Sequence, residues 1–352
     1  MEDVAPYTEI DRLDLRMYSD EEIEKISVMQ VTSEESINNM GHCCKGGLYD
    51  QRMGVMMRIS TGVCETCHLN AEKCMGHCGH IDMPVPVYNP VFLTHLYKLL
   101  RIVCFGCGSI PANSMDVLQL QYQLKLLSEG YSHEALGVCQ IVSEVREDEI
   151  QVDADGKETK ATGAAVTMLM SLKAKLDAYY ESVSARAADE GSRVYTSTVR
   201  SVRDECVKSF ISSLKPRRFC PNCKYPSFSV IYRMSQMIVA PKATHAGKGK
   251  RDDAVVSGIL DLDLSRQSVL TPLQARQLLR EAWKSDSMTL SQIFPVLNNS
   301  PTKHPTDLFF ISKLLVIPPK YRPLVRMGDL FLEHDSVVLL KNVLRLCRCM
   351  TF

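Results

Sequence analysis

Cysteine residues spaced two positions apart are the feature that most constrains how this chain can fold. One group combines three cysteines with a histidine and reads Cys64-x2-Cys67-x6-Cys74-x2-His77. Zn²⁺ prefers four sulfur or nitrogen ligands in a tetrahedron, and two short knuckles joined by a loop provide that geometry. This spacing therefore predicts a structural zinc site at these four residues.

A second group consists of two Cys-x2-Cys pairs that lie far apart in the chain, Cys104/Cys107 and Cys220/Cys223. Either pair could be a redox motif, but neither lies in the βαβ context of thioredoxin-type motifs. Four thiolates leave no open coordination position, so a zinc ion held by all four would be structural and not hydrolytic. The residues between the pairs would then form an inserted subdomain that the metal ties at its base.

The remaining cysteines give no comparable pattern. Cysteine accounts for 14 of 352 residues, which is well below the density of a disulfide-rich secreted scaffold. In a reducing compartment such thiols stay free unless a metal binds them. Cys78 and His80 lie beside His77, and either could replace it as the fourth ligand. Small buried side chains or inert thiols are predicted for the others, which are Cys43, Cys44, Cys139, Cys206, Cys347 and Cys349.

Length, charge and hydropathy exclude several classes of protein. A chain of 352 residues allows roughly two or three domains, and its 45% hydrophobic content excludes wholesale disorder. The 41 basic side chains equal the 41 acidic ones, so no overall field attracts the chain to nucleic acid or to an acidic membrane. The N-terminus carries no secretory signal, and the apolar stretch Leu308–Pro319 is too short to cross a bilayer. The chain is predicted to be intracellular, without a membrane segment.

Hydrophobic periodicity and capping residues predict a mixed α/β, helix-rich fold. Helices are predicted at 19–28 with Ser19 as N-cap, at 90–104, 113–130 and 166–183, and at 271–283 with Thr271 as N-cap. Strands are predicted at 228–239 and 308–317. The acidic run 144–158 is predicted to be an exposed loop or hairpin tip, and 241–253 a flexible basic loop.

No catalytic constellation is visible in the sequence. It contains no P-loop, no HExxH motif and no GxGxxG motif after a predicted strand. Isolated carboxylate pairs such as Asp252-Asp253 are predicted to lie on solvated surfaces. The residues alone therefore indicate a metal-stabilised protein rather than an enzyme with a complete active site.

The residues around the first group resemble those of a known family. Residues 64–81 read CETC-x6-CMGHCGHI, and CFGC follows at 104–107. This arrangement resembles the N-terminal clamp of the largest subunit of multisubunit DNA-directed RNA polymerases. The GGLYD turn at 46–50 and the PVPVYNP segment at 84–90 are most similar to the RNA polymerase I version. Residues 308–323 resemble the strand and proline-rich turn that lead to that family's lid.

The resemblance implies a multidomain, zinc-stabilised polymerase clamp. It implies a clamp core over 1–103 with the first zinc site, and a clamp head inserted over 104–225 and closed by the second zinc site. The clamp core would continue over 226–318, and 319–352 would begin the lid and active-site region. Met75, Cys78 and Lys224 depart from the residues usual in the family, but none of them removes a ligand.

By this resemblance, the chain is expected to close over template DNA in a polymerase that transcribes ribosomal RNA genes. The expected partners are other polymerase subunits, notably the second-largest, together with the DNA template and the DNA–RNA hybrid, in the nucleus and nucleolus. Two structural Zn²⁺ ions are expected in the chain, and Mg²⁺ only in the complete enzyme. The family's magnesium-binding Asn-Ala-Asp-Phe-Asp-Gly-Asp loop does not occur in these residues. The chain is therefore expected to be an N-terminal portion of a nucleotidyltransferase that is inactive alone.

Nucleic-acid contacts are expected in the proline-rich turn, where Lys320, Arg322 and Arg326 cluster. The resemblance places this turn at the entry to the lid, which faces the hybrid. Two other hypotheses stay open at this point. The chain could be a stand-alone, non-catalytic, zinc-stabilised binding module, or part of the largest subunit of RNA polymerase II or III.

Overall fold

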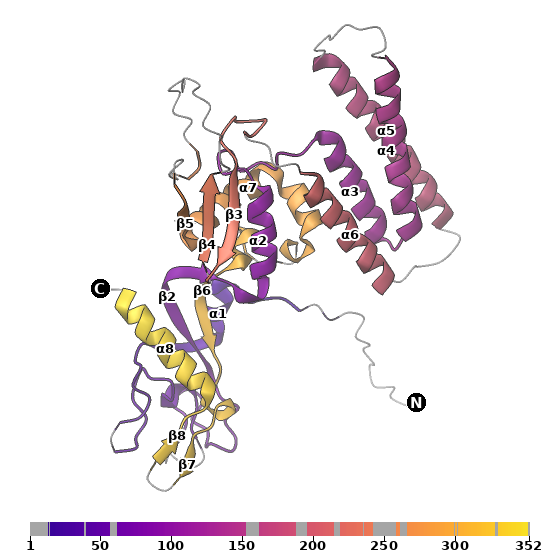
Figure 1. Ribbon diagram of the computed structural model, residues 1–352. Coiled ribbons are helices and arrows are strands. Elements are labelled where there is room, and N and C mark those ends of the chain that lie inside the picture. The colour runs from indigo at the N-terminus through magenta and orange to yellow at the C-terminus, as the bar shows by residue number, and fades with distance from the viewer. Residues whose placement is uncertain are drawn as a thin grey trace, which may run out of the picture. The chain divides into compact units, whose positions relative to one another are not determined.

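The computed structural model describes the backbone of residues 13, 15–38, 40–56, 62–152, 162–187, 196–214, 219–234, 236–241, 258–260, 266–298, 300, 302–327 and 330–350. The chain divides into two compact units (Figure 1). The first contains residues 1–93 and 298–352, and the second contains residues 94–297. Both units combine helices with a small sheet, so the predicted mixed α/β, helix-rich fold is confirmed. The finer division into four clamp segments stays a prediction.

The first unit is built around a three-stranded sheet of order β1-β2-β6. β1 (Ser27–Gln30) pairs in parallel with β2 (Cys78–Tyr88), and β2 pairs antiparallel with β6 (Phe310–Val316). The register of β2 against β6 shifts between Asp82 and Val87, where the two prolines of the strand offer no backbone N–H to a neighbour. Figure 1 shows β2 and β6 side by side although they lie far apart in the sequence.

Among the described residues of this unit, two α-helices and a short hairpin accompany the sheet. Helix α1 (Asp20–Ile26) starts with a capping box, in which the Ser19 hydroxyl accepts from the Glu22 N–H and the Glu22 carboxylate accepts from the Ser19 N–H. The helix ends earlier than predicted because the next residues form β1. Strands β7 (Val325–Met327) and β8 (Leu330–Leu332) precede helix α8 (Asp335–Met350). The core of the unit includes Val31, Leu48, Tyr49, Met53, Ile81, Val316 and Val337.

The second unit contains most of the helices and a separate antiparallel sheet. Its helices are α2 (Leu93–Ile102), α3 (Ser114–Ser128), α4 (Ser132–Val152), α5 (Thr162–Ala187), α6 (Ser197–Ser213) and α7 (Pro272–Ile293). Its strands are β3 (Phe228–Arg233), β4 (Gln236–Pro241) and β5 (Ser268–Leu270), in the order β3-β4-β5. Helix α3 packs against α4, α5 and α6 (Figure 1). Thr271 caps α7 in a second capping box, as predicted.

Three other predicted elements also differ in the structure. The strand predicted at 228–239 is a hairpin, because Met234 has φ 49° and reverses the chain between β3 and β4. The loop predicted at 144–158 is wrong for 144–152, which form the end of α4, since Val142 and Val145 continue its buried face. The strand predicted at 308–317 begins at Phe310, after a 3-10 helix at Pro305–Phe309. Residues 153–158 and the basic residues Lys242, Lys248, Lys250 and Arg251 lie outside the described residues.

Within the part of the chain that the structure describes, no helix combines the length and the apolar character that a bilayer span requires.

Candidate metal centres

The first centre, defined by Cys64, Cys67, Cys74 and His77, lies in the loop that precedes β2. One ligand atom from each of the four residues lies within 4.8 Å of all the others. The Cys74 Sγ and His77 Nε2 atoms are 3.7 Å apart. Cys64 and Cys74 are buried together with Val55, while Cys67 and His77 are partly exposed. The structure therefore brings the four residues predicted from the spacing into one group.

Tight turns give this loop its shape. The His68 N–H donates to the Cys64 carbonyl at 2.8 Å, with His68 itself at φ 56°. Gly76 has φ 88°, and its N–H donates to the Cys74 sulfur at 3.4 Å. A Cβ at Gly76 would lie 2.5 Å from Pro318 Cβ, so only glycine fits between the loop and the 318–320 turn. The Lys320 ammonium donates to the Cys74 carbonyl at 3.1 Å and adds a second contact to that turn.

The thiols of the first centre have unequal acidities when no metal is bound. A hydrogen bond with the His77 side chain lowers the pKa of Cys67 to about 6. Burial raises the pKa of Cys74 to about 11. Metal ligation requires thiolates, so the binding of a metal here would release protons, including that of Cys74.

The two alternative ligands, Cys78 and His80, do not join this group. Both lie on β2, where the His80 Nδ1 atom contacts the Ser27 hydroxyl at 2.6 Å. The His80 Nε2 atom lies 3.6 Å from the Asp82 carboxylate. Of the three candidates for the fourth ligand, the geometry favours His77.

The second centre, defined by Cys104, Cys107, Cys220 and Cys223, joins the two distant pairs. All four sulfurs lie within 4.8 Å of one another. The Cys104 and Cys223 sulfurs are 3.6 Å apart, and those of Cys107 and Cys220 are 3.9 Å apart. With a Zn–S bond of about 2.3 Å, two thiolates on a tetrahedral zinc lie about 3.8 Å apart. The four sulfurs therefore fit a zinc ion.

Matching turns form the two knuckles of the second centre. Helix α2 ends at Ile102, and Cys104 follows shortly after this end, as the periodicity predicts. The Gly108 N–H donates to the Cys104 carbonyl, and the Lys224 N–H donates to the Cys220 carbonyl, both at 2.9 Å. Lys224 has φ 58°, which explains why the resembled family usually has glycine at this position. Burial raises the pKa of the Cys104 thiol.

The second centre packs on helix α7 at a kink. Asp286 departs from helical geometry, with φ −134° and ψ 42°, and its carboxylate accepts the Ile110 N–H at 2.7 Å. A Cβ at Gly108 would lie 3.0 Å from the Ala282 backbone nitrogen. The knuckle and the kinked helix therefore support each other.

Replacing Asp286 by alanine is expected to lower the free energy of unfolding by about 2 kcal/mol, because the N–H of the buried Ile110 loses its acceptor. Urea unfolding of the metal-loaded chain measures this effect. The control is Glu281→Ala on the same helix, which removes only an exposed ion pair with Lys284 and should change stability by less than about 0.5 kcal/mol. Equal effects of both substitutions would show that the Asp286 contact does not support the centre.

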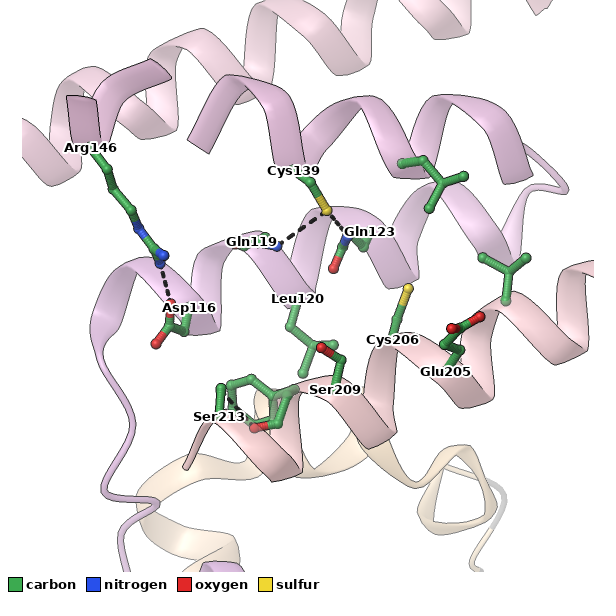
Figure 2. Close-up of a pocket in the computed structure, with 13 residues that line it drawn as sticks. Asp116, Gln119, Leu120, Gln123, Cys139, Arg146, Glu205, Cys206, Ser209 and Ser213 are labelled. Atoms are coloured by element: carbon green, nitrogen blue, oxygen red, sulfur yellow. Dashed lines mark hydrogen bonds and ion pairs between the residues drawn. The ribbon is translucent and has the colours of Figure 1, made fainter. Parts of the chain in front are cut away.

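The other cysteines join neither centre within the described residues. Cys43 and Cys347 pack at the edge of the first unit's core, as predicted for small apolar side chains. Cys139 and Cys349 are exposed, so of the two predicted alternatives the buried side chain does not apply to them. Cys139 and Cys206 both line a pocket of about 450 Å³ among α3, α4 and α6 (Figure 2). The Cys139 sulfur there accepts from the Gln123 side-chain amide at 3.0 Å.

The predicted basic cluster is not assembled on one surface. Arg322 is fully buried, its Nε donates to the Ile317 carbonyl at 2.9 Å, and its Nη2 donates to the Leu48 carbonyl. The guanidinium lies 5.2 Å from the centre of the Tyr49 ring, and burial lowers the pKa of Arg322 to about 10. This burial contradicts a phosphate contact by Arg322. Lys320 is exposed, and the side chain of Arg326 lies outside the described part of the chain.

Comparison with known proteins gives a family and several relatives. A family model described as RNA polymerase Rpb1, domain 1, matches residues 7–349. The chain is 26% identical to the DNA-directed RNA polymerase I subunit RPA190 of Saccharomyces cerevisiae, over 96% of this chain and 23% of that protein. It is 25% identical to the subunit rpa1 of Schizosaccharomyces pombe, with the same two coverages of 96% and 23%.

A third relative is the DNA-directed RNA polymerase I subunit RPA1 of Drosophila melanogaster, which is 28% identical over 94% of this chain and 19% of that protein. The chain therefore spans between 19% and 23% of the length of these curated relatives.

Proposed function

The chain belongs to the family described as RNA polymerase Rpb1, domain 1, and from this premise we propose that it forms the mobile clamp of an RNA polymerase I largest subunit. In this role it closes over template DNA during transcription of ribosomal RNA genes. One observation carries the proposal. Three relatives that are named as RNA polymerase I subunits align with 94% to 96% of the chain, so the similarity is not limited to the cysteine motifs.

Two zinc ions are part of this proposal, one in each centre. Each ion would have four protein ligands and no open position, so zinc would supply stability and not hydrolytic chemistry. The first ion would hold the loop at 64–77 against β2 and the 318–320 turn. The second would join the two ends of the segment between Cys107 and Cys220.

The proposed partners are the other polymerase subunits, notably the second-largest, and the DNA template with its DNA–RNA hybrid. The proposed location is the nucleus and its nucleolus. Lys320 and Arg326 are the basic residues of the proline-rich turn that remain candidates for phosphate contacts.

Native affinity purification of the tagged protein from its own cells tests the assignment. We expect mass spectrometry to find the second-largest subunit of RNA polymerase I, and imaging to find the protein in the nucleolus. Recovery of subunits specific to RNA polymerase II or III would instead assign the chain to that polymerase. Recovery without any polymerase subunit would favour a stand-alone binding module.

The chain alone is expected to make no RNA. The aspartate loop that holds catalytic magnesium in the resembled family is absent from these 352 residues, and two-metal phosphoryl transfer requires such carboxylates. A primed DNA–RNA hybrid, labelled nucleotides and Mg²⁺ provide the assay, with a complete polymerase as the positive control. Template-dependent extension by the isolated chain would refute this prediction.

A further inference from the structure

A serine hydroxyl contacts one of the four sulfurs of the second centre. The Ser109 Oγ atom lies 3.0 Å from the Cys107 sulfur. The same oxygen receives a hydrogen bond from the Asn222 side-chain amide at 3.0 Å. Because the amide nitrogen only donates, the Ser109 oxygen acts as acceptor toward Asn222, and its single proton is available to the sulfur.

The two residues come from opposite knuckles of the centre. Ser109 follows Cys107 by two positions, and Asn222 lies between Cys220 and Cys223. The Ser109 carbonyl also accepts the Cys104 N–H at 3.0 Å, which anchors the serine in the turn of its own knuckle. The side-chain hydrogen bonds therefore link the two knuckles in addition to the four sulfurs.

We propose that Ser109 and Asn222 are positioning residues of the second centre, with Asn222 orienting the Ser109 hydroxyl and Ser109 donating to the Cys107 thiolate. This inference rests on the proposed function, since it takes zinc as the bound metal. Four thiolates around Zn²⁺ carry an excess of negative charge, and a hydrogen bond to one sulfur stabilises that charge and fixes the direction of the sulfur. Loss of such an outer contact typically weakens metal binding by about 10-fold to 100-fold.

The experiment measures zinc transfer from the full chain to a chromogenic chelator. The unmodified chain must first contain two zinc ions, which tests the zinc part of the proposed function separately. Ser109→Ala is then expected to release one of the two ions about 10-fold faster and to leave the other unchanged. Ser109→Thr, which keeps the hydroxyl, should release zinc at nearly the original rate.

Asn222 provides the decisive comparison, because it is exposed and its replacement should not disturb folding. Asn222→Ala should accelerate release of the same ion by a smaller factor. The double variant should match Ser109→Ala alone, because Asn222 acts through Ser109. If the double variant instead released zinc faster by the product of the two single factors, the proposal that Asn222 acts through Ser109 would be wrong.

A spectroscopic measurement separates a sulfur contact from a general loss of stability. With Co²⁺ in place of zinc, Ser109→Ala should shift the sulfur-to-cobalt charge-transfer band, and Ser109→Thr should not. The control is Thr66→Val in the first centre, where the hydroxyl donates to the Arg52 carbonyl at 2.7 Å and not to a sulfur. An unchanged band and an unchanged release rate in Ser109→Ala would overturn the proposal.

Discussion

Replacement of Cys67 by serine is expected to lower the zinc content of the chain from two ions to one and to abolish cooperative unfolding of the first unit. Zinc binding contributes about 10–16 kcal/mol to small zinc-dependent domains, which is as large as the total stability of most proteins. Cys64 and Cys74 would then remain buried in the loop without a metal, and only Val55 with a few partly buried side chains packs against them. That apolar cluster is too small to hold the loop.

Metal analysis and thermal unfolding followed by circular dichroism measure these two effects. The loop around 64–77 should also become sensitive to protease in the variant. The control is Cys206→Ser, because Cys206 lies in the pocket among α3, α4 and α6 and joins neither centre. A similar loss of zinc or stability in both variants would contradict the division into ligands and spare thiols.

Arg322→Met is expected to lower the free energy of unfolding by roughly 3 kcal/mol. Methionine fills most of the same space, but the Ile317 and Leu48 carbonyls lose their donor, at a cost of about 1–3 kcal/mol each. Removing the buried guanidinium charge also removes its desolvation penalty, which offsets part of this loss of stability. The Tyr49 hydroxyl, which donates to the Arg322 carbonyl at 3.3 Å, keeps its acceptor and limits the damage.

Urea unfolding measures this loss, and DNA binding at several salt concentrations separates it from a role at the surface. A phosphate contact contributes just under one unit to the slope of log affinity against log salt. Arg322→Met should leave that slope unchanged while it destabilises the fold. Lys320→Met on the exposed side of the same turn is the control, with a stability loss of no more than about 1 kcal/mol. A smaller slope of log affinity against log salt in a stable Arg322→Met protein would show that Arg322 does contact nucleic acid.

Local sequence was sufficient for the knuckles and for the helix starts after Ser19 and Thr271. A two-residue gap between cysteines forces a tight turn, so both centres could be predicted from spacing, and two incomplete pairs implied a shared metal. The capping boxes at Ser19 and Thr271 likewise depend only on residues three positions away. These features rest on contacts between near neighbours in the chain, and the sequence displays such neighbours directly.

The features that the sequence did not predict depend on contacts between segments that meet only in the folded chain. Arg322 resembled a surface residue because its partners, Leu48 and Tyr49, precede it by more than 270 positions. The first part of the acidic run belongs to α4, whose buried face continues from Val142 to Val145. At the kink of α7, the Asp286 carboxylate likewise accepts the N–H of Ile110, which lies far away in sequence. Burial and hydrogen bonding by distant groups outweigh local propensity at such positions, because an unpaired buried polar group costs more than a change of local conformation.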